Sequence, residues 1–186
     1  MDIILKKKGY RQELERSMKM LSMDKRVLFI GQSVKYSGNA IFNTLEGIDI
    51  KKKIELPVFE ETQMGLSLGL ALQGFVPVTI YPRIDFLLSA TNQLVNHLDK
   101  IRMMSKGQFN PKVIIRTSVA SKWPLDGGPQ HTQDHTEAMK KLLTSVKVHK
   151  FQKSSEIYRT YKKIISKSDN DSHLVIEDAS YYNLKN

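Results

Sequence analysis

The sequence predicts an α/β protein in which a mainly parallel sheet lies between two layers of helices, a three-layer αβα arrangement. Three observations support this prediction. Short runs rich in Val, Ile and Leu alternate along the chain with segments of helical periodicity. The runs in the first half of the chain end at Gly or Pro, which interrupt regular structure. The 186 residues, 40% hydrophobic and 26% charged, are enough to bury a core and have the composition of a globular protein.

The first half of the chain is expected to supply three strands and three helices. Helices are predicted where apolar residues recur every three or four positions, as Leu14, Met18 and Leu21 do. Strands are predicted where an apolar run stops at Gly or Pro. In order, the expected elements are a helix at Tyr10–Ser22, a strand at 26–31, a short helix at 39–47, a strand at 53–57, a helix within 57–74 and a strand at 75–82.

The second half continues the alternation. A long helix is predicted at 83–106 because one stripe of the helix carries Phe86, Ala90, Leu94, Leu98 and Ile101. The elements expected after it are a strand at 112–118, a Gly- and Pro-containing loop at 120–130, a helix at 137–143, a strand at 145–150, a helix at 157–166 and a strand at His173–Asp178. No internal repeat or linker interrupts this order, so residues 1–186 are expected to form a single domain.

Ligands of an open parallel sheet bind beyond the carboxyl ends of the strands, where loops lead into helices. Three segments of the chain are expected at that edge, namely 57–61, 81–86 and 119–135. These segments therefore hold the candidate functional residues.

The amino-acid composition limits the cellular compartments and the classes of binding partner that we expect for this protein. The chain has no cysteine, which excludes disulfides and thiolate zinc sites, and it has no signal-peptide core or apolar run of about 20 residues. We therefore expect a cytoplasmic, full-length protein that does not bind membranes. The formal net charge of +10 raises nucleic acid as a partner, but the lysines are dispersed, so a solvated surface is favoured and no nucleic acid is expected. A basic rim also suits an acidic subunit or a phosphorylated ligand.

Two carboxylates, Glu60 and Glu61, stand at the start of an apolar helix in the segment PVFEETQMGLSLGLALQG. The helix macrodipole alone favours acidic residues in a first turn, and this interpretation stays open. The helix behind them is nearly all apolar, so we expect it to be buried on most sides. Gly65 and Gly69 weaken it by about 1 kcal/mol each, which the close approach of another backbone would offset. Partial desolvation at the start of such a helix raises the pKa of a glutamate and suits it to proton transfer.

The loop DGGPQHTQDH presents two histidines. His131 and His135 have the i, i+4 spacing of a helical metal site, but no third ligand supports one, and we expect no metal there. His131 is better suited to exchange a proton with a substrate, although a plain surface loop is an equal alternative.

Phe86 and Tyr81 are aromatic residues of the kind that usually belongs to the hydrophobic core. There is no Walker loop, GxGxxG or GxSxG motif, so the residues by themselves predict a carboxylate–histidine cleft and no particular reaction.

Taken in order, these segments resemble the pyrimidine-binding domain of thiamine-diphosphate enzymes. The β-subunit of the E1 component of 2-oxo acid dehydrogenases is the closest member, and transketolase is a more distant one. The family motif is a glutamate, four residues and then G-Φ-x-x-G, which is matched here by Glu60, ETQM and GLSLG. The similarity spans nearly the whole chain, through GFVPVTIYP for the next strand, DFLLSATNQLVN for the aromatic-bearing helix, GGPQHTQ for the histidine loop and HLVIEDASYY for the last strand.

The resemblance implies roles for individual residues. Glu60 would hydrogen-bond N1′ of the aminopyrimidine of thiamine diphosphate, so that the exocyclic nitrogen can take the proton from thiazolium C2. Phe86 would stack on the pyrimidine ring, and His131 would face the substrate and assist proton transfer. Gly65 and Gly69 belong to the cofactor-binding motif and would thin the helix where paired domains approach closely.

The resemblance also implies partners. In this family a second domain with a Gly-Asp-Gly motif holds the diphosphate and Mg²⁺, and this sequence lacks that motif. A separate α-type subunit would therefore hold the Mg²⁺, in an α2β2 heterotetramer. The sequence stops at Asn186, before the C-terminal domain of E1β and transketolase, and Gln32 and Ser33 replace an acidic pair. Decarboxylation of a 2-oxo acid is the expected reaction; transketolase-like two-carbon transfer and a non-catalytic assembly paralogue are the alternatives.

Overall fold

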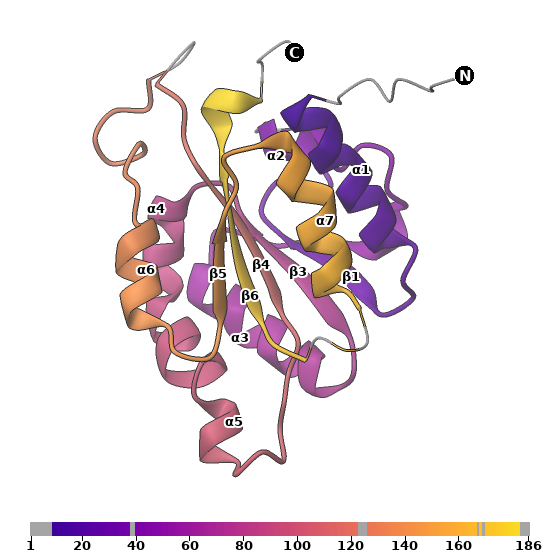
Figure 1. The fold of residues 1–186 in the computed structure, drawn as a ribbon, viewed down its shortest axis with the longest axis vertical. Helices are drawn as coiled ribbons and strands as arrows, with labels where there is room; N and C mark the ends of the chain where they lie inside the picture. The colour runs from indigo at the N-terminus through magenta and orange to yellow at the C-terminus, as the bar shows by residue number, and fades with distance from the viewer. Residues whose placement is uncertain (1–8, 38–39, 123–125, 167, 169, 183–186) are drawn as a thin grey trace.

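The computed structural model describes residues 9–37, 40–122, 126–166, 168 and 170–182 (Figure 1). Its strands are β1 (Val27–Gly31), β2 (Lys53–Glu55), β3 (Val76–Tyr81), β4 (Ile114–Val119), β5 (Lys147–Lys150) and β6 (His173–Asp178). Its helices are α1 (Tyr10–Ser22), α2 (Ala40–Asn43), α3 (Glu60–Leu72), α4 (Ile84–Leu87), α5 (Ile101–Met104), α6 (Thr136–Leu142) and α7 (Ser154–Ile164). The predicted alternation is confirmed, except that position 39 of the short helix and positions 123–125 of the loop lie outside the described residues.

The sheet has the strand order β2-β1-β3-β4-β6-β5, and all five of its described pairings are parallel. The chain passes from β1 to β2 on one side and then crosses back to β3 on the other side of β1. The direction of winding therefore reverses between β1 and β3. In open α/β sheets, such a switch point is where ligands bind, at the carboxyl ends of the strands.

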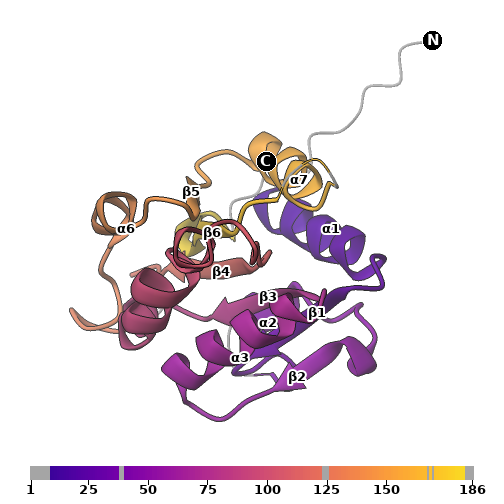
Figure 2. The same cartoon turned by 90° about the horizontal axis from the view of Figure 1, so that it is seen from below.

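Helices cover both faces of this sheet, which confirms the predicted three-layer architecture. Figures 1 and 2 show α1 and α7 on one face and α3 on the other. Each face has its own apolar core: α1, α2 and α7 pack on residues such as Phe29 and Val175, whereas α3, α6 and the 84–98 region pack on residues such as Ile115 and Ile176. Within the part of the chain that the structure describes, no helix is long and apolar enough to cross a membrane.

The predicted long helix at 83–106 is divided into short pieces. Between α4 and α5 the backbone passes through a 3₁₀ turn and a π-helical segment, Gln93–Leu98. Ala90, Leu94 and Leu98 are nevertheless buried, as predicted, although they recur every four residues. The π segment explains this, because its wider turn, closed by i to i+5 hydrogen bonds, keeps a four-residue repeat on one side.

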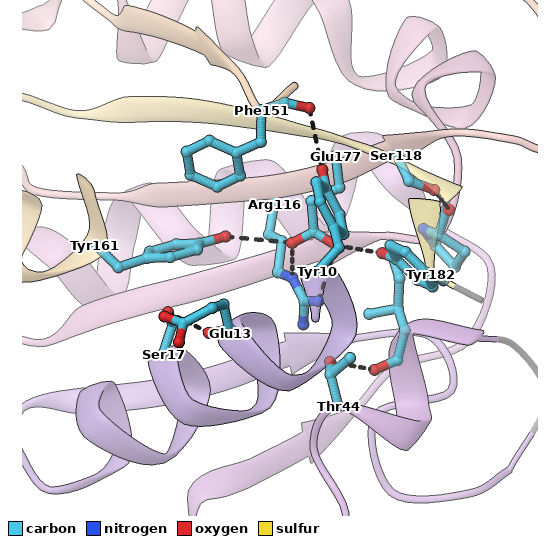
Figure 3. A network of polar contacts seen from close by, with 12 residues as sticks. Tyr10, Glu13, Ser17, Thr44, Arg116, Ser118, Phe151, Tyr161, Glu177 and Tyr182 are labelled. Carbon is cyan, nitrogen blue, oxygen red and sulfur yellow. Dashed lines mark hydrogen bonds and ion pairs between the residues drawn. The ribbon is translucent and has the colours of Figure 1, made fainter. Parts of the chain in front are cut away.

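A buried ion pair joins β4 to β6 on the α7 face of the sheet (Figure 3). Arg116 donates from Nε and Nη2 to the two carboxylate oxygens of Glu177, at 2.5 and 3.0 Å, and neither side chain is exposed. Tyr161 and Tyr182 donate their hydroxyls to the same carboxylate. Burial, together with the charge of Glu177, raises the pKa of both tyrosines well above the usual value, so they remain neutral donors. The network ties α7 and the chain after β6 to the centre of the sheet.

Candidate functional site

A shallow depression lies at the switch point, beyond the carboxyl ends of β1 and β3. It brings together the loop after β1, the segment that enters α3, and the segment between β3 and α4. The residues that line it are Gln32, Pro57, Val58, Phe59, Glu60, Gln63, Ile80, Tyr81, Pro82 and Phe86. Two of the three segments predicted to face ligands, 57–61 and 81–86, therefore meet here.

The floor of the depression depends on a close approach between β1, β3 and α3. A Cβ on Gly31 would lie 2.4 Å from the carbonyl oxygen of Ile80 and 3.1 Å from Nε2 of Gln63, and Gly31 has φ of +150°, so a side chain is excluded. The buried Gln63 donates to Oγ1 of Thr79 at 2.9 Å and to the carbonyl of Ile80 at 3.0 Å. These bonds attach the first turn of α3 to β3.

The loop after β1 is held by Glu55, the last residue of β2. Its carboxylate accepts three backbone N–H groups, from Ser33 at 2.5 Å, Val34 at 2.8 Å and Lys35 at 2.7 Å. Ser33 has the left-handed φ of +56°, a conformation that costs free energy and that these bonds stabilise. Glu55 thereby positions Gln32 at the rim of the depression.

Glu60 and Glu61 have different surroundings, although they are adjacent in α3. Glu61 is exposed and accepts a hydrogen bond from Nδ2 of Asn92 at 3.1 Å. Glu60 is half-buried in the depression, and its carboxylate has no hydrogen bond or ion pair with any described residue. Its backbone carbonyl accepts the hydroxyl of Tyr81 at 3.0 Å, and burial raises the pKa of Tyr81, which keeps that donor protonated. Tyr81 thus fixes the backbone from which the free carboxylate projects.

Phe86 links the depression to the histidine loop. Its ring lines the depression, and the ring of His131 meets it edge-on, with centroids 5.5 Å apart and an interplanar angle of 85°. Nδ1 of His131 is buried and has no hydrogen-bond partner among the residues that the structure describes. Glu60, Phe86 and His131 therefore lie along one edge of the sheet, with Phe86 between the other two.

A second group of polar side chains joins α4 to the residues that follow His131. Asp85 is almost fully buried and accepts hydrogen bonds from the backbone and side chain of Gln133, while Nε2 of His135 lies 3.9 Å from the same Asp85 oxygen. The other Asp85 oxygen and Nε2 of His135 have no hydrogen-bond partner. The two histidines do not share a helix, because α6 begins only at Thr136. Across the described ranges no group of three or more His, Cys, Asp or Glu side chains is placed to hold a metal ion.

The outward side of α3 is apolar and exposed, which differs from the expected burial on most sides. Only four residues of α3 are buried, namely Gln63, Met64, Ser67 and Ala71. Leu66 and Leu72 are 39% and 41% exposed. A Cβ on Gly65 would meet only the side chain of Gln93, at 3.7 Å, and nothing described lies within 4 Å of a Cβ on Gly69. The periodicity of α3 indicated an apolar helix, but it could not indicate which apolar side faces away from the chain's own core.

The fold and this edge define a class of protein. It is an open parallel α/β protein with a carboxylate, an aromatic ring and an imidazole at its switch point, the place where such proteins hold small ligands. The family model of the transketolase pyrimidine-binding domain matches residues 7–184. The chain belongs to that family, as its motifs indicate.

Similar proteins include β-subunits of 2-oxo acid dehydrogenases. The chain is 32% identical over 125 residues to the 3-methyl-2-oxobutanoate dehydrogenase subunit beta of Mycobacterium tuberculosis, covering 63% of this chain and 34% of that protein. It is 26% identical over 169 residues to the 2-oxoisovalerate dehydrogenase subunit beta of Pseudomonas aeruginosa, covering 88% and 46%. Among solved structures, a split-gene transketolase described as an inactive beta4 tetramer superposes with a TM-score of 0.67 at 15% identity, covering 92% of this chain and 51% of that one, which shows a shared fold. The chain spans less than half the length of these two curated relatives.

Proposed function

We propose that this chain is the pyrimidine-binding subunit of a split thiamine-diphosphate-dependent enzyme. It completes active sites with a separate α-type subunit that holds the diphosphate and Mg²⁺. The observation that carries the proposal is the half-buried carboxylate of Glu60, which projects without a partner into the switch-point depression. Membership of the pyrimidine-binding family supports it, because Glu60 and the following GLSLG match the glutamate–glycine motif by which the sequence resembles that family.

The residues present fit the aminopyrimidine of thiamine diphosphate. An unpaired carboxylate suits a ring nitrogen that shares a proton, and Phe86 offers an aromatic ring beside it. When bound, the cofactor supplies the carbanion chemistry next to a carbonyl. Glu60 would hold the proton at the ring nitrogen, Tyr81 keeps the backbone of Glu60 in place, and His131 would exchange a proton with the substrate. The orphaned Nδ1 of His131 is consistent with a group that is completed by a ligand or another chain.

Decarboxylation of a 2-oxo acid is the reaction that we favour, since the curated relatives are named as β-subunits of such dehydrogenases. Transketolase-like two-carbon transfer is the second candidate, and the name of the split-gene transketolase supports it. That structure is described as an inactive tetramer of β chains, which is consistent with a β-type chain that needs a second subunit for activity. A non-catalytic assembly subunit is the alternative from another class.

The exposed apolar side of α3 is the surface that we assign to subunit association, in an α2β2 complex. Leu66 and the open Gly69 let another backbone approach closely, and burying this side would remove apolar area from water. Such a contact would also enclose the neighbouring Glu60, so that the depression becomes a drier site. We place the complex in the cytoplasm, because a chain without cysteine is suited to a reducing compartment.

Calorimetry tests this function. The chain is co-purified with the product of a neighbouring gene that encodes a Gly-Asp-Gly domain, and thiamine diphosphate with Mg²⁺ is titrated into each chain and into the mixture. We expect heat of binding in the mixture and little in this chain alone. A mixture that assembles but binds no thiamine diphosphate would contradict the proposal.

A further inference from the structure

Arg83 is a cation at the edge of the site, and no described residue is paired with it. It is the residue that precedes α4, directly after β3, and it is half-buried. Its guanidinium makes no hydrogen bond or ion pair with any other described residue. A partly buried guanidinium loses hydration, so it gains from an oxyanion that restores its hydrogen bonds.

The histidine loop leaves space for this guanidinium. A Cβ on Gly127 would lie 2.8 Å from Nη1 of Arg83 and 2.9 Å from Cβ of His131, closer than side chains tolerate. The guanidinium of Arg83 therefore lies against the backbone of Gly127, next to His131. Since His131 contacts Phe86, Arg83 is on the same edge as the depression that Glu60 lines.

No carboxylate of a described residue forms an ion pair with Arg83, and Asp126, next to Gly127, accepts a hydrogen bond from the backbone N–H of Gly128. Asp85 is only two residues away, but its side chain is turned to Gln133 and His135. The buried Nδ1 of His131 also has no partner among the described residues. The histidine side of the site thus holds a positive charge that no described carboxylate compensates, and a guanidinium complements an oxyanion.

We propose that Arg83 is a specificity-determining residue that binds an oxyanion of the substrate, a carboxylate or a phosphate, at the histidine side of the cleft. This inference rests on the proposed function, because 2-oxo acids and phosphorylated sugars share such a group. Arg83 supplies binding rather than chemistry. A group that is held equally in the ground state and the transition state lowers KM and leaves kcat unchanged.

The test compares Arg83→Gln and Arg83→Lys in the complex with the cognate α-type subunit. We expect KM for the anionic substrate to rise about 10- to 100-fold in Arg83→Gln, with a smaller rise in Arg83→Lys and kcat within a few fold. Gly127→Ala, which keeps the charge but pushes a Cβ against Arg83 and His131, should raise KM as well. Arg102→Gln, an exposed arginine of α5, is the matched control and should change neither parameter. KM is measured separately with a 2-oxo acid and with a phosphorylated ketose. The substrate whose KM rises in Arg83→Gln identifies the oxyanion as a carboxylate or a phosphate.

A second readout does not need turnover. In the whole chain, the Nε–H resonance of Arg83 is assigned by its absence in Arg83→Gln and followed while inorganic phosphate or acetate is added. We expect the Nε–H resonance of Arg83 to shift with one of the two anions and the Nε–H resonance of Arg102 to remain unchanged. Unchanged KM in Arg83→Gln overturns the inference even if Glu60→Gln abolishes turnover, in which case the proposed function stands. If the complex shows no turnover at all, a resonance of Arg83 that shifts with neither anion overturns the inference on its own.

Discussion

Two residues set the shape of the switch point. Gly31 lets the carbonyl of Ile80 and the side chain of Gln63 approach β1, and Gln63 attaches the first turn of α3 to β3. The position of the Glu60 carboxylate therefore depends on a short, fully bonded contact and not on the mobility of a surface loop. A rigid backbone position suits the proton-sharing role that we propose for Glu60, because the carboxylate must be correctly placed before the ligand binds.

Asp99 performs a comparable task away from the site. Its buried carboxylate accepts the backbone N–H groups of Thr144, Ser145 and Val146 and an ion pair from Lys100, which join the end of the π-helical segment to the loop before β5. Burial alone would raise the pKa of Asp99, but the bonds from Lys100 and the backbone outweigh it and hold the pKa well below the usual range.

The low pKa of Asp99 leads to a prediction about acid stability. The folded chain binds the proton less readily than the unfolded chain, so the contribution is complete above pH about 4 and is lost as the pH falls below that value. We expect Asp99→Asn to lower the free energy of unfolding by about 2 kcal/mol at pH 7 and by clearly less at pH 3. Urea unfolding at both values measures this, with the exposed Asp49→Asn as control. A difference from wild type that is the same at both pH values would contradict the assignment.

The positions of the candidate site residues in the fold were predictable only where a local pattern marks them. Glu60, Phe86 and His131 stand in recognisable motifs, and the sequence placed all three at the carboxyl edge of the sheet. Glu55, Gln63 and Arg83 were not singled out, because their partners are 16 to 44 residues away and come close only in the folded chain. The available signal for Glu55 was a carboxylate at the end of an expected strand, and for Arg83 a charge between a strand and a helix.

At the scale of elements, the two sides of α3 have different surroundings. Its inner side packs on the sheet through Met64 and Ala71, and its outer side exposes Leu66 and the open Gly69. Glycine lowers the intrinsic stability of such a helix, and nothing within the described chain offsets that cost at Gly69. A subunit that packs closely on this side would offset it.

Gly65→Leu tests that surface. A leucine at this position would displace Gln93 and project into the space that an approaching backbone needs. We expect the complex to dissociate, seen as a lower mass in light scattering, while circular dichroism shows the helix content of the wild type. Met103→Ala, a change at an exposed apolar residue of α5, is the control and should leave the mass unchanged. An intact assembly in Gly65→Leu would mean that this side of α3 is not the contact.

The order and type of the elements followed from periodicity, since the strands are apolar runs and most helices have a clear repeat, and in the first half of the chain Gly or Pro also marks the strand ends. The backbone geometry within an element, such as the type of helical turn, could not be predicted from periodicity. The stripe through Ala90, Leu94 and Leu98 indicated a buried face, but a repeat of four residues fits a continuous α-helix and a π-helical insertion equally, and packing on the sheet decides between them.

At the scale of the whole molecule, one parallel sheet supports both the depression lined by Glu60 and the exposed side of α3. In our proposal a partner subunit binds that side of α3 and encloses the depression. The switch between β1 and β3 places the depression at the carboxyl edge, and α3 extends from that edge along one face. The chain spans less than half of its curated relatives from M. tuberculosis and P. aeruginosa. In the function that we propose, a partner subunit would hold the diphosphate. The sequence predicted this architecture well because alternation of strand and helix is a property of the entire chain.

The buried pair Arg116–Glu177 is the polar centre of this architecture (Figure 3). Removing one charge would leave the other buried without compensation, so we expect Glu177→Gln to lower the free energy of unfolding by about 3–5 kcal/mol in urea titrations. Glu137→Gln, which breaks the exposed pair with Lys140, is the control and should cost less than about 1 kcal/mol. A loss that is equally small in both variants would show that the network does not stabilise the fold.

The most direct test of the central claim is the turnover of Glu60→Gln in the assembled complex with its α-type subunit. Glutamine keeps the size of the side chain but cannot share a proton, so we predict that the complex forms with the wild-type mass and that turnover falls at least about 100-fold. Glu61→Gln, its exposed neighbour, should retain full turnover. Full activity in Glu60→Gln would contradict the assignment of this carboxylate to the cofactor's ring nitrogen.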